Sequence, residues 1–196
     1  MDEQDSFLRQ VEGFLAPVER AVSIMRTLDH ALAYDRSGES KGAAFGKYVD
    51  DLHDLIRNER LDDSKVMLAT ARVLDTRQPK SVTELRADFC HLGHMVLWSL
   101  LERSERSISK IRTAGELSRK QKILRKYLRT LVLALGNAGR KRSSLSLREL
   151  MNIDSALDET AEAFPQLAEY QAFDHLTWLG LGIFLDPRSS ESRFVW

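Results

Sequence analysis

The chain has 196 residues, 43% of them hydrophobic and 30% charged, and its formal net charge is zero. This composition is typical of a folded globular protein and excludes a chain that is disordered because of its composition. The single cysteine, Cys90, excludes an internal disulfide framework and any zinc site that takes more than one sulfur from this chain. The polar, acidic N-terminus and the lack of an apolar run of about 18 residues predict a protein that is neither secreted nor transmembrane.

Helical periodicity is present almost everywhere in the sequence, and the alternation typical of β-strands is nearly absent. The apolar spacing predicts four helices in the first part of the chain, over 5–15, 17–32, 45–56 and about 62–74. We expect Pro17 to begin the second helix, because proline fits the first turn of a helix but not its interior. The segment DRSGESKG, over 35–42, is predicted to be a loop.

Two capping boxes mark the starts of helices further along the chain. Ser81-x-x-Glu84 predicts the start of a long helix over 81–111, and Ser146-x-x-Glu149 predicts the start of a helix that ends before Pro165. Three more segments complete the chain, namely a helix over 116–135, a flexible connector over 136–144 and a last helix over 165–185.

The expected fold is therefore all-α, with about eight helices that form either one bundle or two helical lobes. The segment RTAGE, over 112–116, is the best candidate for a domain boundary. It would separate an N-terminal helical domain, 1–112, from a C-terminal helical domain, 117–196.

The charge is distributed very unevenly along the chain. From Arg103 to Arg148 there are fourteen basic and two acidic residues, a net charge of +12. Residues 1–102 hold thirteen basic and eighteen acidic residues, and residues 149–196 hold two and nine, so these flanks carry −5 and −7. The centre of the basic segment is RKQKILRKYLRT, over 119–130, which has six basic residues and no acid.

In the predicted helix over 116–135, leucines gather on one side and cations on the other, while Lys120 lies at the margin between them. The cations on the polar side are Arg119, Lys122, Arg125, Lys126 and Arg129, and Arg140, Lys141 and Arg142 follow in the connector. An ordinary solvated face mixes signs to gain i,i+4 pairs, but this one has no acid after Leu117. The pattern favours binding to phosphate or anionic lipid over a plain solvated face. Contact with the acidic flanks of a second copy is an alternative use.

The apolar side of this helix bears on the kind of anion. Tyr127 is the only aromatic residue of the basic segment and lies on the apolar side, so sequence-specific reading of nucleic acid is not supported. Leucine and isoleucine, rather than tryptophan or phenylalanine, form the rest of that side, which favours electrostatic adhesion to a membrane over insertion.

The segment RADFCHLGH, over 86–94, contains the residue types of a catalytic or metal site. Arg86-x4-His91 resembles the Arg-x4-6-His signature of HEPN-domain ribonucleases, an all-helical family in which the arginine and histidine act at the scissile phosphate. Cys90 and His94 are spaced i,i+4 and could form half of a metal site, but no second half is visible, and no cofactor or metal is expected. A histidine packed on a helix and a buried cysteine are the alternative interpretations.

A helical chain of this size with a basic amphipathic helix at its centre resembles the matrix proteins of orthomyxoviruses. The segment RKQKILRK, over 119–126, is similar to the Arg-Lys-rich helix of that family. The resemblance implies two helical domains, self-polymerisation, and contact with the inner face of an envelope and with ribonucleoprotein. It also implies that Arg119, Lys120, Lys122, Arg125 and Lys126 contact anionic lipid or RNA.

We therefore expect a non-enzymatic assembly protein in the cytoplasm or nucleus, at the inner face of a membrane or virion. Its expected partners are further copies of itself, an anionic membrane surface, and RNA or ribonucleoprotein bound without sequence specificity. Two alternatives stay open, an HEPN-like ribonuclease using Arg86 and His91, and a helical adaptor or effector that binds an acidic protein.

Overall fold

The computed structural model describes residues 3–34, 38–75, 77, 80–141 and 146–165. These residues form six α-helices and no β-strand: α1 Glu3–Tyr34, α2 Gly38–Asn58, α3 Ser64–Leu74, α4 Val82–Ser109, α5 Gly115–Lys141 and α6 Leu147–Ala163. The all-α prediction is confirmed for this part of the chain, while the count is lower than the expected eight. The helix predicted over 165–185 lies outside the described residues from Gln166 onward.

Helix α1 shows that the prediction of two helices meeting at Pro17 is wrong, because the proline lies inside one continuous helix. An interior proline removes one N–H donor and costs about 3 kcal/mol. The carbonyl that loses its helical partner belongs to Gly13, which is exposed and can bind water instead. Leu15 and Val18 are both fully buried beside the proline. Burial of each such side chain contributes about 1.5–3 kcal/mol, so the packed face holds the helix together across the break.

Two segments predicted to be loops are partly helical. Helix α2 begins at Gly38, inside the predicted loop 35–42, and α5 continues to Lys141, through most of the predicted connector 136–144. A glycine costs a helix about 1 kcal/mol relative to alanine, which tertiary packing can outweigh. Gly136 faces Trp98 of α4, and a Cβ built on it would lie 3.5 Å from the indole nitrogen. The glycine therefore sits within a packed helix rather than at its end.

The other boundaries agree with the sequence predictions. Helices α3, α4 and α6 span nearly the predicted ranges. Both capping boxes are formed: Ser81 and Ser146 each accept the N–H of the glutamate three residues later, and each glutamate accepts from the serine N–H. Hydrogen bonds from the Ser81 backbone and hydroxyl lower the pKa of the Glu84 carboxyl, because both favour its charged form.

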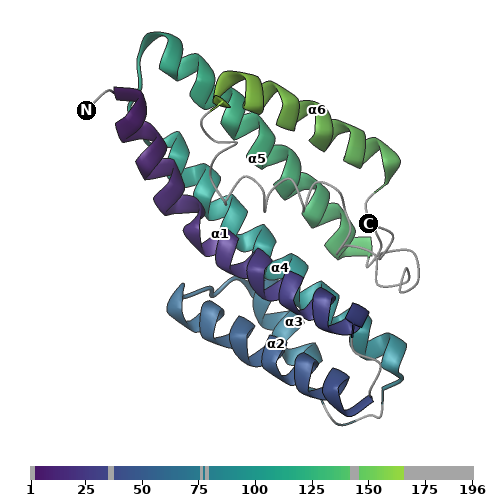
Figure 1. The fold of residues 1–196 in the computed structure, drawn as a ribbon. Helices are drawn as coiled ribbons and strands as arrows, with labels where there is room; N and C mark the ends of the chain where they lie inside the picture. Colours follow the sequence, from purple (N-terminus) through teal and green to yellow (C-terminus); the bar gives the residue numbers. More distant parts are fainter. Residues whose placement is uncertain (1–2, 35–37, 76, 78–79, 142–145, 166–196) are drawn as a thin grey trace.

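Helix α4 is the centre of the fold (Figure 1). It packs against α1, α2, α3 and α5, and α5 in turn carries α6 on its other side. Buried residues from α1 to the end of α6 belong to one hydrophobic core, and Phe7 stacks on Phe164 with 5.7 Å between ring centroids. The turn between α4 and α5 falls at the candidate boundary 112–116, and residues on both sides of it contribute to this core.

Gly93 allows three helices to approach closely at one point of the core. A Cβ built on this residue of α4 would lie 2.5 Å from the Tyr48 hydroxyl of α2 and 2.9 Å from the Met25 methyl of α1. Real Cβ atoms do not approach other atoms so closely, and Tyr48 is buried and donates a 2.9 Å hydrogen bond to the Phe89 carbonyl. Glycine is therefore required here by packing, although it lowers the intrinsic helix propensity of α4.

We predict that Gly93→Ala lowers the free energy of unfolding by about 1–3 kcal/mol, because the added methyl group must displace Tyr48 or Met25. Urea denaturation monitored by circular dichroism measures the change. Gly46→Ala in α2 is the matched control, since a Cβ there meets no atom within 4 Å. It should leave stability unchanged or raise it by up to about 1 kcal/mol, as alanine favours a helix. Equal effects of the two substitutions would contradict the packing argument.

Candidate anion-binding surface

The turn between α4 and α5 is held by one buried side chain, Gln121. Its amide nitrogen donates to two carbonyls, that of Ile108 in the last turn of α4 at 2.6 Å and that of Ile111 just after the helix at 3.0 Å. Its amide oxygen accepts from the Thr113 hydroxyl at 2.6 Å. The Ile108 carbonyl also accepts from the Ile111 N–H at 3.2 Å, so Gln121 adds a second partner there and links α5 to the last turn of α4 and to the residues that follow it. This network fixes where the basic helix begins relative to α4.

The leucine side of α5 packs as the sequence predicts. Leu124, Tyr127 and Leu128 are completely buried, and Gln121 lies among them. Burial raises the pKa of the Tyr127 phenol far above its usual value, so this side chain is neutral at physiological pH. No aromatic ring of the described part of α5 is therefore exposed to stack on a nucleobase.

The cations on the opposite side of α5 form a stripe along the helix. Lys122, Lys126, Arg129 and Leu133 follow one another at intervals of four, three and four residues, and all four are exposed. We call these four residues the α5 stripe. Arg119 is also exposed and lies one turn before Lys122, at the same end as the α4–α5 turn.

Arg129 of this stripe and Arg125 beside it are paired with a single carboxylate of α4. Arg125 Nε and Arg129 Nε lie 2.8 and 2.9 Å from the same oxygen of Glu105. Only 7% of Glu105 is exposed, so this carboxylate needs charged partners to offset its desolvation. The sequence had placed Arg125 and Arg129 in the anion-binding set, and the structure gives both of them a role in joining α4 to α5.

Two lysines of the predicted set also have partners within the chain. Lys126 Nζ lies 2.8 Å from the carboxylate of Glu159, which joins α5 to α6. Lys120 is largely buried at the apolar margin, where its ammonium lies 3.6 Å from Glu116 and 5.9 Å from the ring centroid of Phe164. This position agrees with the predicted margin and leaves Lys120 poorly placed to meet a flat anionic surface.

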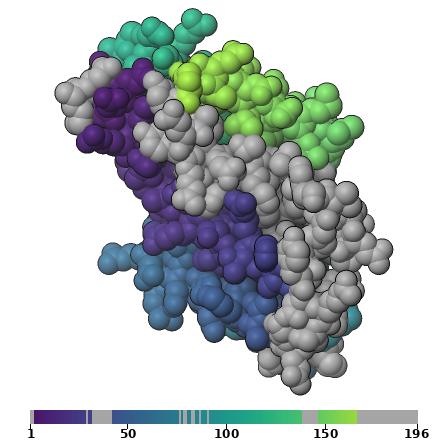
Figure 2. Space-filling view, in the orientation of Figure 1, coloured from purple at the N-terminus to yellow at the C-terminus, as the bar shows by residue number. Residues whose placement is uncertain are grey.

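Arg119 and Lys122 are different, because the described residues provide neither with an ion-pair partner. Lys110 and Arg112, in the adjacent turn, are exposed in the same way. Both belong to the basic segment of the sequence but not to the predicted anion-binding set, and the hydrogen bond between Thr113 and Gln121 holds their turn against the start of α5. Among the described residues none of these four cations has an ion-pair partner, and we call Lys110, Arg112, Arg119 and Lys122 the unpaired cations. Figure 2 shows this end of the molecule, drawn in teal, at the surface next to α6.

The remaining cations of the predicted set are Arg140, Lys141 and Arg142. Arg140 and Lys141 belong to α5, but their side chains lie outside the described part of the structure, and Arg142 lies outside it altogether.

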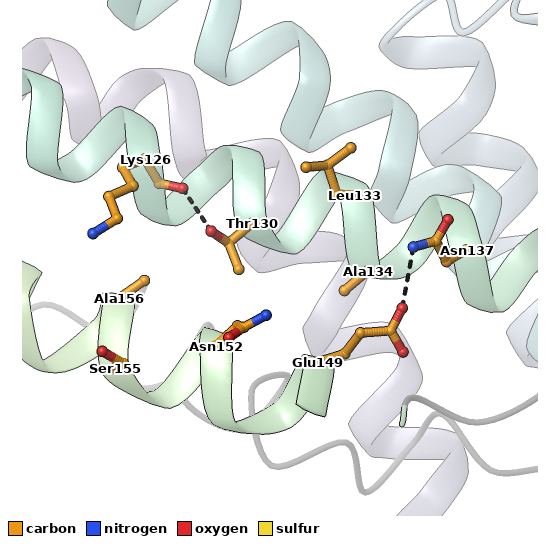
Figure 3. A pocket seen from close by; sticks show the side chains of 9 residues that line it. All are labelled: Lys126, Thr130, Leu133, Ala134, Asn137, Glu149, Asn152, Ser155 and Ala156. Atoms are coloured by element: carbon orange, nitrogen blue, oxygen red, sulfur yellow. Dashed lines mark hydrogen bonds between the residues drawn. The ribbon is translucent and has the colours of Figure 1, made fainter. Parts of the chain in front are cut away.

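A shallow groove runs between α5 and α6 beside the stripe (Figure 3). Its volume is about 400 Å³, and its floor is formed by small residues such as Ala134 and Ala156. Lys126 lines one end, and the Asn137 amide donates to Glu149 at 3.1 Å at the other. Leu133, which also lines the groove, is 68% exposed, and on α6 Met151 is 64% exposed. Both helices of the groove therefore carry an exposed aliphatic side chain.

The residues considered for catalysis or metal binding lie on α4. Arg86 and His91 are five residues apart, which places them about 140° apart around the helix axis, and the side chain of Arg86 is not among those described. His94 is buried, and the side chain of Cys90 is also outside the described set. Within the described residues no group of three or more histidine, cysteine or acidic side chains could hold a metal ion.

None of the helices in the described ranges is long and apolar enough to cross a membrane. Comparison of the chain with protein-family models, with curated proteins and with solved structures finds no match.

We predict that Glu105→Gln lowers the free energy of unfolding by about 1–3 kcal/mol, because it leaves Arg125 and Arg129 without the carboxylate that they share. Thermal and urea denaturation measure the loss. Glu116→Gln is the control, because its side chain is 82% exposed and its ion pair is long, so its effect should stay within about 0.5 kcal/mol. If Glu105→Gln were as mild as this control, the Glu105 cluster would not join α4 to α5.

Proposed function

We propose that this chain is a non-enzymatic assembly protein of the matrix type, which self-associates and adheres to anionic membrane surfaces. The unpaired cations are the contact surface. The exposure of Arg119 and Lys122 without a carboxylate partner in the described residues is the observation that carries the proposal.

The contrast within α5 supports a binding role for these two residues. Where a cation of α5 serves the fold, the chain supplies an acid for it, as Glu105 does for Arg125 and Glu159 does for Lys126. Like charges on a helix surface destabilise it slightly when no acid separates them. Arg119 and Lys122 therefore add repulsion without a compensating contact among the described residues, which is expected of charges that meet an external anion.

The surroundings of the stripe favour lipid over nucleic acid. A surface that binds single-stranded nucleic acid usually offers aromatic rings for stacking, and Tyr127 is buried. Leu133 on α5 and Met151 on α6 instead expose aliphatic side chains. Cations that meet lipid phosphates, with exposed aliphatic side chains elsewhere on the same two helices, suit the surface of an anionic bilayer.

The acidic side chains of α6 are the surface that would meet the cations of a second copy. Asp154, Asp158 and Glu162 are exposed on this helix, which packs beside α5. Complementary charges on one chain speed and orient the encounter of two copies, even where they add little to affinity.

We predict that Arg119→Glu/Lys122→Glu reduces binding to phosphatidylserine-containing vesicles by at least about tenfold, since each basic residue near such a surface contributes about 1 kcal/mol. Flotation with vesicles of phosphatidylcholine with and without phosphatidylserine, at low and raised salt, measures the change. Wild-type binding should require phosphatidylserine and weaken with salt.

Arg57→Glu/Arg60→Glu is the matched control, because it makes the same change in net charge at the exposed end of α2. It should float like wild type. Binding that ignores lipid charge, or that both double variants lose equally, would contradict the proposed surface. Wild-type binding to single-stranded RNA but not to vesicles would reassign the surface to nucleic acid. Cleavage of that RNA, abolished in His91→Ala, would contradict the non-enzymatic role.

A further inference from the structure

Helix α3 exposes an apolar face that the fold does not use. Met67, Leu68 and Leu74 are 58%, 60% and 54% exposed, and the small residue Ala71 lies between them and is also exposed. Met67, Ala71 and Leu74 are spaced i, i+4 and i+7, so with Leu68 they form one continuous face. We call these four residues the outer face of α3.

The opposite face of this short helix already anchors it to the protein. Val66 and Ala69 are fully buried, and α3 packs on α4 through them. At the start of the helix, the Ser99 hydroxyl of α4 donates to the Asp63 carboxylate, and the Lys65 ammonium lies 3.8 Å from the ring centroid of Trp98. The helix is thus apolar on both sides, and its outer face is not required for its attachment to α4.

We propose that the outer face of α3 is the contact through which two copies of this chain pair, with the two α3 helices antiparallel. An antiparallel pair centred beside Ala71 brings Met67 of each copy opposite Leu74 of the other. The small Ala71 at the centre lets the two backbones approach, while the larger side chains fill the space at either end. The face is therefore complementary to itself under a two-fold axis, as a symmetric dimer contact requires.

The charges at the ends of α3 select the antiparallel orientation. The N-terminal end has two acidic residues, Asp62 and Asp63, and one basic residue, Lys65, so it is net negative. The C-terminal end has two basic residues, Arg72 and Arg77, and one acidic residue, Asp75, so it is net positive. The antiparallel pair brings the net negative end of each copy to the net positive end of the other. It also opposes the two helix dipoles, whereas a parallel pair aligns them and brings like ends together.

The size of the face sets the strength of the contact. Four side chains from each copy are far fewer than the roughly 20–30 residues a side of a standard stable interface. The pairing is therefore weak and concentration-dependent in solution, and it becomes effective when copies are gathered on one surface. This inference rests on the proposed assembly function for its role, but it concerns residues remote in sequence from the cations that would bind lipid.

Sedimentation velocity of the full chain over a wide concentration range, without lipid, tests the contact. We expect wild type to associate as concentration rises, and Met67→Glu/Leu74→Glu to raise the dissociation constant at least about tenfold, because each contact then buries unpaired carboxylates. Both residues are more than half exposed, so the variant should melt at nearly the wild-type temperature. Ala43→Glu/Leu147→Glu, at an exposed alanine of α2 and an exposed leucine of α6, makes the same change in net charge and is the control that should associate like wild type.

A cysteine placed at the two-fold axis tests the orientation. In a Cys90→Ser background, Ala71→Cys should give a disulfide-linked dimer under mild oxidation, and Asp50→Cys, on exposed α2 surface, should not. Association that persists in Met67→Glu/Leu74→Glu, or equal cross-linking at the two positions, overturns the α3 contact and leaves the proposed function standing. A wild type that stays monomeric at every concentration overturns the self-association part of the proposed function as well. Vesicle binding by Met67→Glu/Leu74→Glu separates the two surfaces, because loss of pairing should leave the lipid contact of each single copy in place.

Discussion

The packing of α5 against α4 is the interaction on which the rest of the described fold depends. It joins two large parts of the hydrophobic core, and it pairs polar groups of the two helices with one another. Gln121 closes the end of α4 by accepting and donating across the turn, and Glu105 draws two arginines of α5 onto α4. Helix α6 then packs on α5, so its position is set by the same contact. A shift of α5 would break all of these contacts at once, because packed interiors respond as a unit rather than residue by residue.

The same contact divides the cations of the basic helix into two kinds. Zero net charge conceals a segment of +12, and the fold brings acids from other helices to part of it. Arg125 and Lys126 are neutralised by carboxylates that are distant in the sequence, so their charge belongs largely to the structure. Arg119 and Lys122 remain exposed at the end of the bundle, beside the turn that Gln121 holds. The proposed lipid contact therefore rests on fewer residues than the sequence pattern implies, and each of them matters more.

The two proposed surfaces would serve assembly in different ways. The cations near the start of α5 would concentrate copies on an anionic surface by long-range attraction, which is weak per residue and sensitive to salt. The outer face of α3 would supply a short-range apolar contact between neighbours, too small to hold copies together at low concentration. The weak contact through α3 would become effective on a membrane, because molecules held on one plane meet at a much higher effective concentration. Pairing would in turn strengthen the weak attraction of each copy to the membrane.

The sequence by itself determined the local features, namely the all-α class, both capping boxes and the leucine side of α5. These depend on residues within a few turns of one another, so periodicity and spacing are sufficient to predict them. Only the tertiary structure decided that α1 continues through Pro17, that α5 continues through Gly136, and that residue 93 must be a glycine. It also decided which cations are paired, because Glu105 and Glu159 reach α5 from other helices. These outcomes depend on contacts between residues far apart in the chain, and the free energy of such contacts outweighs local propensity.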